Sequence, residues 1–358
     1  GGLLTADDLA RWEAPVETPL TFDYRGYRVA KGGAWSQGPV LLQQLALLQG
    51  FDLDDLDPLG PDFVHTVVEC AKLAFADREA WYGDPDFVDV PMPTLLDAAY
   101  NDDRRKLVTS QASLALRPGS PAGRTPRVLV GEATQVAEGG SIGEPTITGI
   151  GEPTVTERGI VAGDTCHVDV IDRWGNMVSA TPSGGWLQSS PVIPELGVCL
   201  GTRMQMFWLE HGLPASLAAG KRPRSTLSPS MVFKDGQPYL AFGTPGGDQQ
   251  DQWSVLMFLR HVHHGMNLQE AIDCPAFHTE HMPSSFYPRA AQPGLVALES
   301  RFSEATRADL ARRGHRLRVG EAWSEGRLSG CAREETRDGR ILKAAANPRG
   351  MQGYAIGR

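Results

Sequence analysis

One irregular stretch divides this chain into two parts of different character. Gly, Pro, Ser, Thr and Glu are frequent in residues 117–163, and apolar residues show no regular spacing there. Such a composition predicts a flexible linker or a surface loop rather than core. The part before it is mainly helical in pattern, whereas the part after it is rich in hairpins. This division favours an α+β fold in which helical layers cover antiparallel sheets.

The first part contains two strong helical patterns and one strand pattern. Pro39–Leu48 and Asp62–Trp81 have the apolar spacing of helices. Phe22–Val29 alternates as a strand does. Near the start, Thr5 is a suitable N-cap for a short helix that ends at Arg11.

The second part begins with two hairpin patterns. His167–Ile171 and Met177–Thr181 flank one tight turn, and Ser230–Lys234 and Pro238–Phe242 flank an Asp-Gly turn. Helices are expected at Trp253–His264, Leu268–Asp273 and Ser303–Arg313.

Charge and composition exclude several function classes. The chain has 358 residues, 41% of them hydrophobic, which is enough for a full core, and a net charge of -9 argues against nucleic-acid binding. The five cysteines have neither metal-like nor disulfide-like spacing, so we expect no metal and no cofactor. No apolar run is long enough to cross a bilayer. The sequence also lacks a signal peptide, which slightly favours the cytoplasm.

Thr165 stands where the irregular stretch meets the first strand of the second part. A flexible segment that leads into a threonine suits intramolecular cleavage, because the hydroxyl can attack the carbonyl of Asp164. The new chain would begin at Thr165, with a free α-amine of pKa about 8 as the base for its own hydroxyl. The pattern alone also fits an ordinary strand threonine.

Several motifs together resemble the γ-glutamyltranspeptidase family over nearly the whole chain. Gly163–His167, continued by Asp172–Thr181, is similar to the segment of that family that carries the nucleophile. The other matching stretches are Lys221–Pro229, Gly243–Gly247, Asp23–Tyr27, Ala76–Arg78 and Gly83–Val88. The resemblance implies the four-layer αββα sandwich of N-terminal-nucleophile hydrolases.

The resemblance also implies roles for individual residues. Thr165 would be the nucleophile, and Ser183 would replace a threonine that hydrogen-bonds to it. Gly246 and Gly247 would offer backbone N–H groups to the oxyanion, where glycine permits a close approach; without the resemblance they would be read as a plain turn. The substrate carboxylate would be bound by Ser225 and Thr226, which could otherwise be an exposed loop.

Three positions depart from the family pattern. The family has Asn near Gly185, Gln near Arg203 and Asp near Met206, and these residues recognise the amino-acid end of the γ-glutamyl group. A buried Met206 cannot pair with an ammonium group, whereas Arg203 could bind a carboxylate. We therefore hypothesise that the acyl donor is not ordinary glutathione. The family's large subunit also begins upstream of Gly1, and a carboxylate-binding arginine lies in that upstream part.

The resemblance further implies a partner arrangement. Residues 1–164 correspond to the end of the large subunit and residues 165–358 to the small subunit. After cleavage the two fragments would stay associated as one structural domain, and a homodimer is compatible with this arrangement. The expected ligand is a small γ-glutamyl compound or another acyl amide, without nucleic acid, membrane segment or cofactor.

Alternatives to this reading remain open. The chain could be a non-catalytic or unprocessed relative that binds a ligand or only assembles. His261 and His264 share a helix face and invite a metal reading, but no carboxylate or cysteine completes a ligand set. Cys166 and His167 invite a thiol mechanism, but adjacent strand residues point to opposite faces.

Overall fold

The computed structural model describes residues 5–129, 165–183, 192–195, 197–199, 201, 203–286, 289–337, 339–349 and 353–357. Most of the expected linker, from residue 130 to residue 163, lies outside the described residues. Gly185 lies outside them as well.

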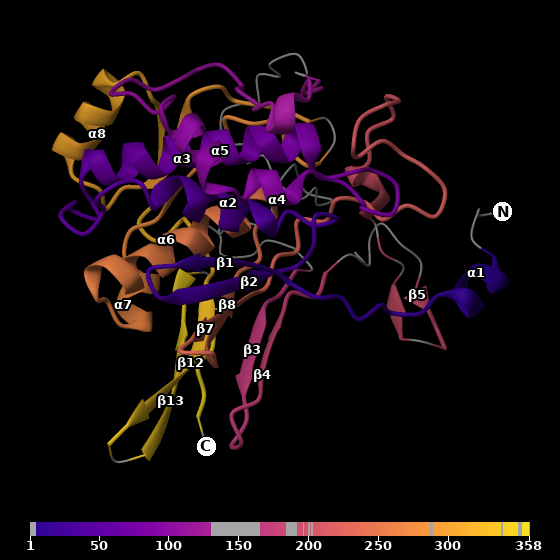
Figure 1. Ribbon diagram of the computed structural model, residues 1–358. Helices are drawn as coiled ribbons and strands as arrows, with labels where there is room; N and C mark the ends of the chain where they lie inside the picture. Colours follow the sequence, from indigo (N-terminus) through magenta and orange to yellow (C-terminus); the bar gives the residue numbers. More distant parts are fainter. Residues whose placement is uncertain are drawn as a thin grey trace.

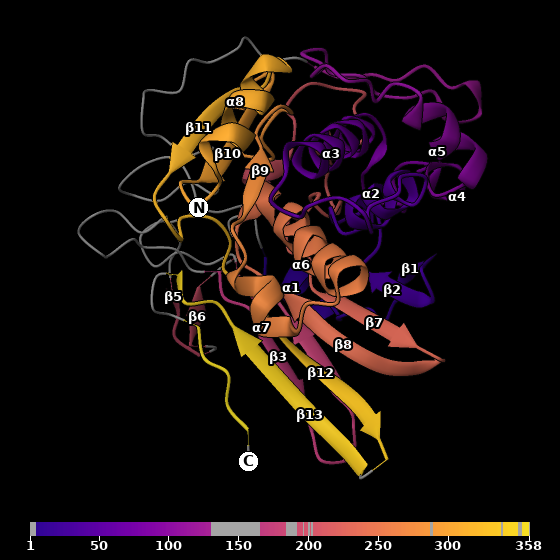
Figure 2. The same cartoon turned by 90° about the vertical axis from the view of Figure 1, so that its left-hand side faces the viewer.

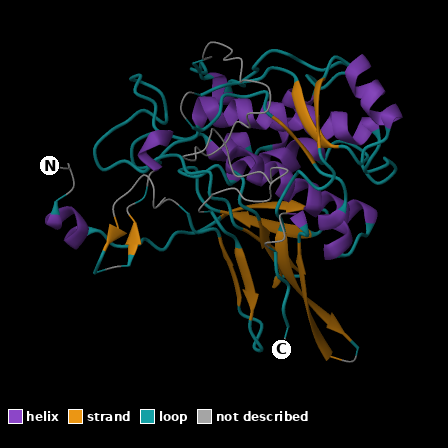
Figure 3. Ribbon diagram, turned by 180° about the vertical axis from the view of Figure 1, so that it is seen from behind, coloured by secondary structure: helices purple, strands orange, loops and turns teal. Residues whose placement is uncertain are grey.

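Eight α-helices occur in the described parts of the chain, and most lie on one side of the largest sheet (Figures 1 and 3). Two of them, α2 and α3, confirm the predicted helices of the first part within one residue. The capping box of α1, formed by Thr5 and Asp8, confirms the predicted N-cap. The bounds are α1 Ala6–Arg11, α2 Pro39–Leu48, α3 Pro61–Trp81, α4 Met92–Leu95, α5 Ala98–Arg105, α6 Gln250–His264, α7 Leu268–Asp273 and α8 Glu304–Arg312.

The main sheet has six strands in the order β1-β2-β7-β8-β12-β13, all antiparallel. Because β2 pairs with β7, the parts of the chain on either side of the expected linker share one sheet. Its strands are β1 Leu20–Tyr24, β2 Tyr27–Lys31, β7 Ser230–Lys234, β8 Gln237–Gly243, β12 Ser329–Thr336 and β13 Gly339–Ala346.

One strand prediction is wrong in detail. The expected strand Phe22–Val29 is a hairpin, β1 and β2, joined by a two-residue turn. The turn residues Arg25 and Gly26 have φ of 51° and 84°. This left-handed geometry at both positions matches the twist of the flanking strands, and glycine adopts it without steric cost.

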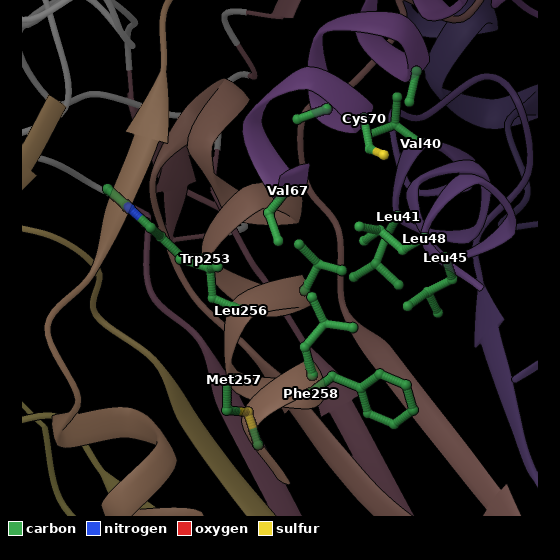
Figure 4. Close-up of a cluster of buried hydrophobic side chains, with 14 of the residues drawn as sticks. Val40, Leu41, Leu45, Leu48, Val67, Cys70, Trp253, Leu256, Met257 and Phe258 are labelled. Atoms are coloured by element: carbon green, nitrogen blue, oxygen red, sulfur yellow. The ribbon is translucent and has the colours of Figure 1, made fainter. Parts of the chain in front are cut away.

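Helices cover one face of the main sheet. The buried residues of α2, α3 and α6 form a single apolar cluster with β8 and β7 (Figure 4). Phe242 of β8 stacks on Phe258 of α6, with ring centroids 6.3 Å apart. Removal of these apolar side chains from water is the main stabilising contribution to the fold.

The opposite face of the sheet carries the hairpin formed by β3 (Val168–Ile171) and β4 (Met177–Ala180). Ser179 Oγ donates to the Phe242 carbonyl at 3.4 Å, and the His167 ring packs against Gly243. On the outer side of the hairpin, Val168 and Val178 are about half exposed. The predicted hairpin is confirmed, and it adds a third layer to the helices and the main sheet.

A small second sheet contains the parallel pair that sequence patterns did not predict. Its order is β11-β10-β9, beside α8 in Figure 2. Because α8 connects β10 to β11, these strands form a βαβ unit with parallel strands rather than a hairpin. The bounds are β9 Phe277–Thr279, β10 Leu295–Glu299 and β11 Arg316–Gly320, and the short strands β5 Val192–Ile193 and β6 Val198–Cys199 pair elsewhere. Among the helices in the described ranges, none is both long and apolar enough to span a membrane.

Candidate functional site

The segment that begins at Thr165 alternates strictly between two environments. Thr165, His167 and Asp169 are partly buried toward the main sheet, whereas Cys166 and Val168 are exposed. This pattern follows from the pleat of an extended chain, whose successive side chains point to opposite faces. As the sequence predicted, Cys166 and His167 therefore do not form a thiol–imidazole pair.

The Thr165 hydroxyl belongs to a short polar chain with Ser183 at its centre. Its Oγ1 is 2.5 Å from Ser183 Oγ, within hydrogen-bond distance. Arg203 Nη2 donates a hydrogen bond to the same Ser183 hydroxyl. Arg203 begins the 3-10 turn η2 (Arg203–Met206), at whose end Met206 is buried. The structure thus brings together the predicted nucleophile, its predicted hydroxyl partner and the predicted carboxylate-binding arginine.

A pocket of about 330 Å³ opens beside Thr165. Its wall includes Pro245, which directly precedes Gly246, and residues of β12 and the C-terminal segment. The threonine and the loop that leads into the two glycines therefore face the same cavity. Among the lining residues are Thr165, His167, Pro245, Arg327, Ser329 and Tyr354.

Gly246 and Gly247 form a specialised turn rather than a plain one. Their φ angles are 138° and 52°. A Cβ atom on Gly246 would lie 2.5 Å from Trp253 Cζ3, so the position has no room for a side chain. The glycines lead into the 3-10 turn η3 (Gly247–Gln249) and then into α6. Backbone N–H groups at such a helix start favour negative charge, as a developing oxyanion requires.

The Ser225–Thr226 loop is buried rather than exposed, which excludes its alternative reading. Ser225 is 8% and Thr226 1% exposed. Ser225 N donates to the Trp35 carbonyl at 2.9 Å, and Gln37 N donates to the Ser225 carbonyl at 2.7 Å. The loop is therefore anchored, through its main chain, to the segment that precedes α2.

The imidazole of His167 and the carboxylate of Asp169 form a buried pair just after Thr165 in the chain. This pair was not predicted from the sequence. His167 Nε2 lies 2.9 Å from Asp169 Oδ2, and both side chains are almost fully buried. His167 Nδ1 is 2.7 Å from Thr181 Oγ1, which joins the residue before β3 to the residue after β4. The i, i+2 spacing of His167 and Asp169 after Thr165 was the available signal, because it places all three on one face.

The three histidines near the end of α6 contact different partners. His261 contacts the Tyr239 hydroxyl at 2.7 Å, and His263 contacts Asp54 at 2.6 Å. His264 packs edge-on against Phe63. The ring nitrogens of His261 and His263 are thus engaged separately rather than directed at a common centre.

A different cluster, of His65, Glu69 and His315, has a geometry that could hold a metal ion. Glu69 already pairs with Lys72 Nζ at 2.6 Å and with Arg117 Nη2 at 3.0 Å. Two cations at this carboxylate oppose the binding of a third. The residues of this cluster therefore fit a buried polar network better than a metal centre.

Comparison with known proteins places the chain in a family. The family model described as Gamma-glutamyltranspeptidase matches residues 1–357. The glutathione hydrolase proenzyme of Bacillus subtilis (strain 168) is 31% identical over 290 residues, covering 80% of this chain and 46% of that protein. This chain spans about half the length of the curated relatives it matches.

Two solved structures agree with this placement. The structure of LmbA2991HD has 54% sequence identity and a TM-score of 0.85, and the match covers 100% of this chain and 58% of that chain. The cephalosporin acylase from Bacillus halodurans has 27% identity and a TM-score of 0.76, covering 100% of this chain and 56% of that one. Motifs, fold and comparisons lead to one assignment: the chain belongs to the γ-glutamyltranspeptidase family, whose relatives include hydrolases and acylases.

Proposed function

We propose that the protein is an amide hydrolase or acyltransferase that forms an acyl-enzyme on Thr165. The observation that carries the proposal is the 2.5 Å contact between Thr165 Oγ1 and Ser183 Oγ. Thr165 also lines a pocket together with Pro245. A hydroxyl in such a contact has a fixed direction, and the neighbouring glycine turn supplies donors for a nearby negative charge.

Maturation would begin with cleavage of the bond before Thr165. The hydroxyl oxygen attacks the carbonyl carbon of Asp164, the C–N bond breaks, and the acyl group moves from nitrogen to oxygen. Water then hydrolyses the ester, which frees the Asp164 carboxylate and the Thr165 α-amine. That amine, with a pKa of about 8, can accept the proton of the hydroxyl beside it at neutral pH.

Turnover would repeat this chemistry on an external amide. The Thr165 oxygen attacks the substrate carbonyl while the α-amine takes its proton. The N–H groups of Gly246 and Gly247 donate to the tetrahedral oxyanion, and the proton passes to the leaving amine. Water or an acceptor amine then attacks the ester and regenerates the hydroxyl.

Arg203 is proposed to select an acyl donor with a carboxylate at its far end. Through Ser183, its guanidinium is one hydroxyl away from Thr165, and Met206 cannot supply the negative charge that an α-ammonium group needs. Ser225 and Thr226 would contact a substrate carboxylate as well. A dicarboxylic acyl amide, such as a glutaryl amide, fits this charge pattern better than a γ-glutamyl amide.

The architecture expected for this chemistry has four layers. The helices, the main sheet and the β3–β4 hairpin would be three layers of an αββα sandwich. Residues up to 164 and residues from 165 onward would then remain together as two associated fragments of one domain.

Cleavage is the first test. Denaturing electrophoresis of the full-length protein should show two fragments, and N-terminal sequencing of one should begin Thr-Cys-His. Thr165→Ala should abolish both the cut and turnover. A chain that stays intact for days would instead favour a non-catalytic relative.

A substrate panel is the second test. γ-Glutamyl-p-nitroanilide and glutaryl-p-nitroanilide differ only in the α-ammonium group, so their ratio of kcat/KM isolates its contribution. We expect the glutaryl compound to be preferred, because Met206 offers no negative charge to an α-ammonium group. Arg203→Gln should raise KM for both compounds, because both carry the carboxylate. Efficient turnover of γ-glutamyl-p-nitroanilide at low KM would contradict the proposed preference for donors without an α-ammonium group.

A further inference from the structure

Gln37 is a fully buried residue that contacts both of the loops assigned to substrate binding. Its main-chain N–H donates to the Ser225 carbonyl at 2.7 Å. Its side-chain Nε2 donates to the Gly247 carbonyl at 3.0 Å. One residue therefore bridges the carboxylate loop and the glycine turn, although it lies far from both in the sequence.

Arg78 of α3 fixes the orientation of the Gln37 amide. Its Nη1 donates to Gln37 Oε1 at 3.0 Å. Because a guanidinium can only donate and a carbonyl can only accept, Oε1 must face Arg78 and the NH₂ group must face Gly247. The contacts thus define the amide orientation without ambiguity.

The same arginine holds the next residue of the turn. Arg78 Nη1 also pairs with Asp248, which accepts from Ser285 N at 2.7 Å and from Ser285 Oγ at 2.5 Å. Burial by itself would raise the pKa of Asp248, but the Arg78 charge and the Ser285 bonds outweigh it and lower the pKa. The carboxylate therefore stays ionised and keeps its partners.

Main-chain bonds are also made on the carbonyl side of the turn, and Gln250 N donates one of them to the Gly247 carbonyl. Gln249 N donates to the Gly246 carbonyl at 2.9 Å. The Gly246 carbonyl and the Gly247 N–H belong to one planar peptide unit, so fixing the first fixes the direction of the second. Gln37 and Gln250 both donate to the Gly247 carbonyl, so the Gly246–Gly247 and Gly247–Asp248 peptide planes have set orientations.

We infer that Gln37, oriented by Arg78, is a positioning residue that sets the glycine turn relative to the Ser225–Thr226 loop. This inference rests on the proposed function, because it assigns Gln37 to the geometry of that reaction. Gln37 itself touches no reacting atom. Its effect should appear in kcat, since the turn would contact charge that develops only in the transition state.

The test is Gln37→Glu in the full-length protein. The carboxylate keeps the bond to Arg78 but places an oxygen about 3.0 Å from the Gly247 carbonyl, where a donor stood. This repulsion should displace the turn. Loss of one oxyanion donor typically costs roughly 10²–10³-fold in kcat, so a displaced donor should cost at least about tenfold, with KM changed by less than about threefold.

Gln44→Glu is the matched control. Gln44 is equally buried, and its Nε2 also donates to main-chain carbonyls, those of Val40 and Asp251. The control therefore introduces the same local repulsion away from the two loops. It should lower thermal stability at least as much, because no described residue donates to Gln44 Oε1 as Arg78 does to Gln37 Oε1, while kcat stays within about twofold of the parent.

Hydrogen exchange supplies a readout that does not depend on turnover. Peptides that cover residues 243–249 should exchange faster in Gln37→Glu than in Gln44→Glu. Gln37→Met, which removes the donor without adding repulsion, should give an intermediate effect if the Glu variant folds poorly.

The outcomes are distinguishable. If the parent is neither cut nor active, the proposed function fails, and exchange alone still decides whether Gln37 holds the turn. If the parent is active but Gln37→Glu matches Gln44→Glu in kcat and in exchange, the positioning role of Gln37 is refuted while the proposed function stands.

Discussion

Replacement of Gly246 by alanine is the sharpest single perturbation of the proposed oxyanion site. At φ of 138° an L-residue is strained, which costs about 1–3 kcal/mol. The new methyl group would also lie 2.5 Å from Trp253 Cζ3, and overpacking of this kind costs about 1–3 kcal/mol. We therefore expect Gly246→Ala to lower the free energy of unfolding by about 2–6 kcal/mol.

The Gly236→Ala variant separates the stability cost of backbone strain from the cost of steric crowding. Gly236 has φ of 72° in the β7–β8 turn, and a Cβ there would meet no atom within 4 Å. Only the left-handed conformation is then penalised, by about 1–2 kcal/mol. Urea unfolding with a common slope would measure both variants as shifts in midpoint.

Activity should separate the two variants further. Relief of the Trp253 clash must move either the indole or the backbone that carries the Gly246 N–H, so kcat should fall by roughly 10²-fold in Gly246→Ala. Gly236→Ala should keep nearly full activity. Equal unfolding midpoints and equal kcat for the two variants would refute the reasoning, because they would mean that the turn at Gly246 is neither crowded nor functional.

Two further predictions concern titration and reactivity. Although burial alone lowers it, Glu325 and Glu280 raise the pKa of His278 to about 9, above an unfolded value near 6.5. Protonated His278 and its two glutamates should therefore contribute their full stabilisation below pH 6.5, and the free energy of unfolding should fall by about 3 kcal/mol as pH rises through 9. Urea midpoints should fall across this pH range, and His278→Gln should make them less dependent on pH. Exposed Cys166 should react with a thiol reagent in the native state faster than buried Cys70, whose thiol pKa is raised by burial. Cys166→Ala should still be cut before Thr165, and an uncut variant would revive the thiol mechanism.

Local patterns predicted much of the secondary structure because its signals are local. Pro39 marks the first residue of α2, and Asp235-Gly236 forms the predicted turn with φ of 51° and 72°. The strand expected at Phe22–Val29 failed because Arg25-Gly26 was not recognised as a two-residue turn. The parallel β10–β11 pair could not be predicted, since it depends on how α8 folds back over a sheet.

The candidate site, too, was predicted only in part from the sequence. Resemblance predicted Thr165 and Ser183, and alternation placed His167 opposite Cys166. Gln37 and Arg78 were missed as a pair, because their contact joins two segments 41 residues apart and neither has a distinctive local pattern. Buried polar networks of this kind depend on tertiary structure, in which each donor must find its acceptor.

The pairing of β2 with β7 has implications for how a mature protein could be rebuilt. Before a cut at Thr165, the strands are tethered and meet in a first-order step whose rate is independent of protein concentration. After the cut they belong to separate molecules, so renaturation becomes a second-order encounter that dilution slows. A precursor would then pair β2 with β7 readily during its first folding. The processed form, once denatured at low concentration, would regain its native structure in low yield.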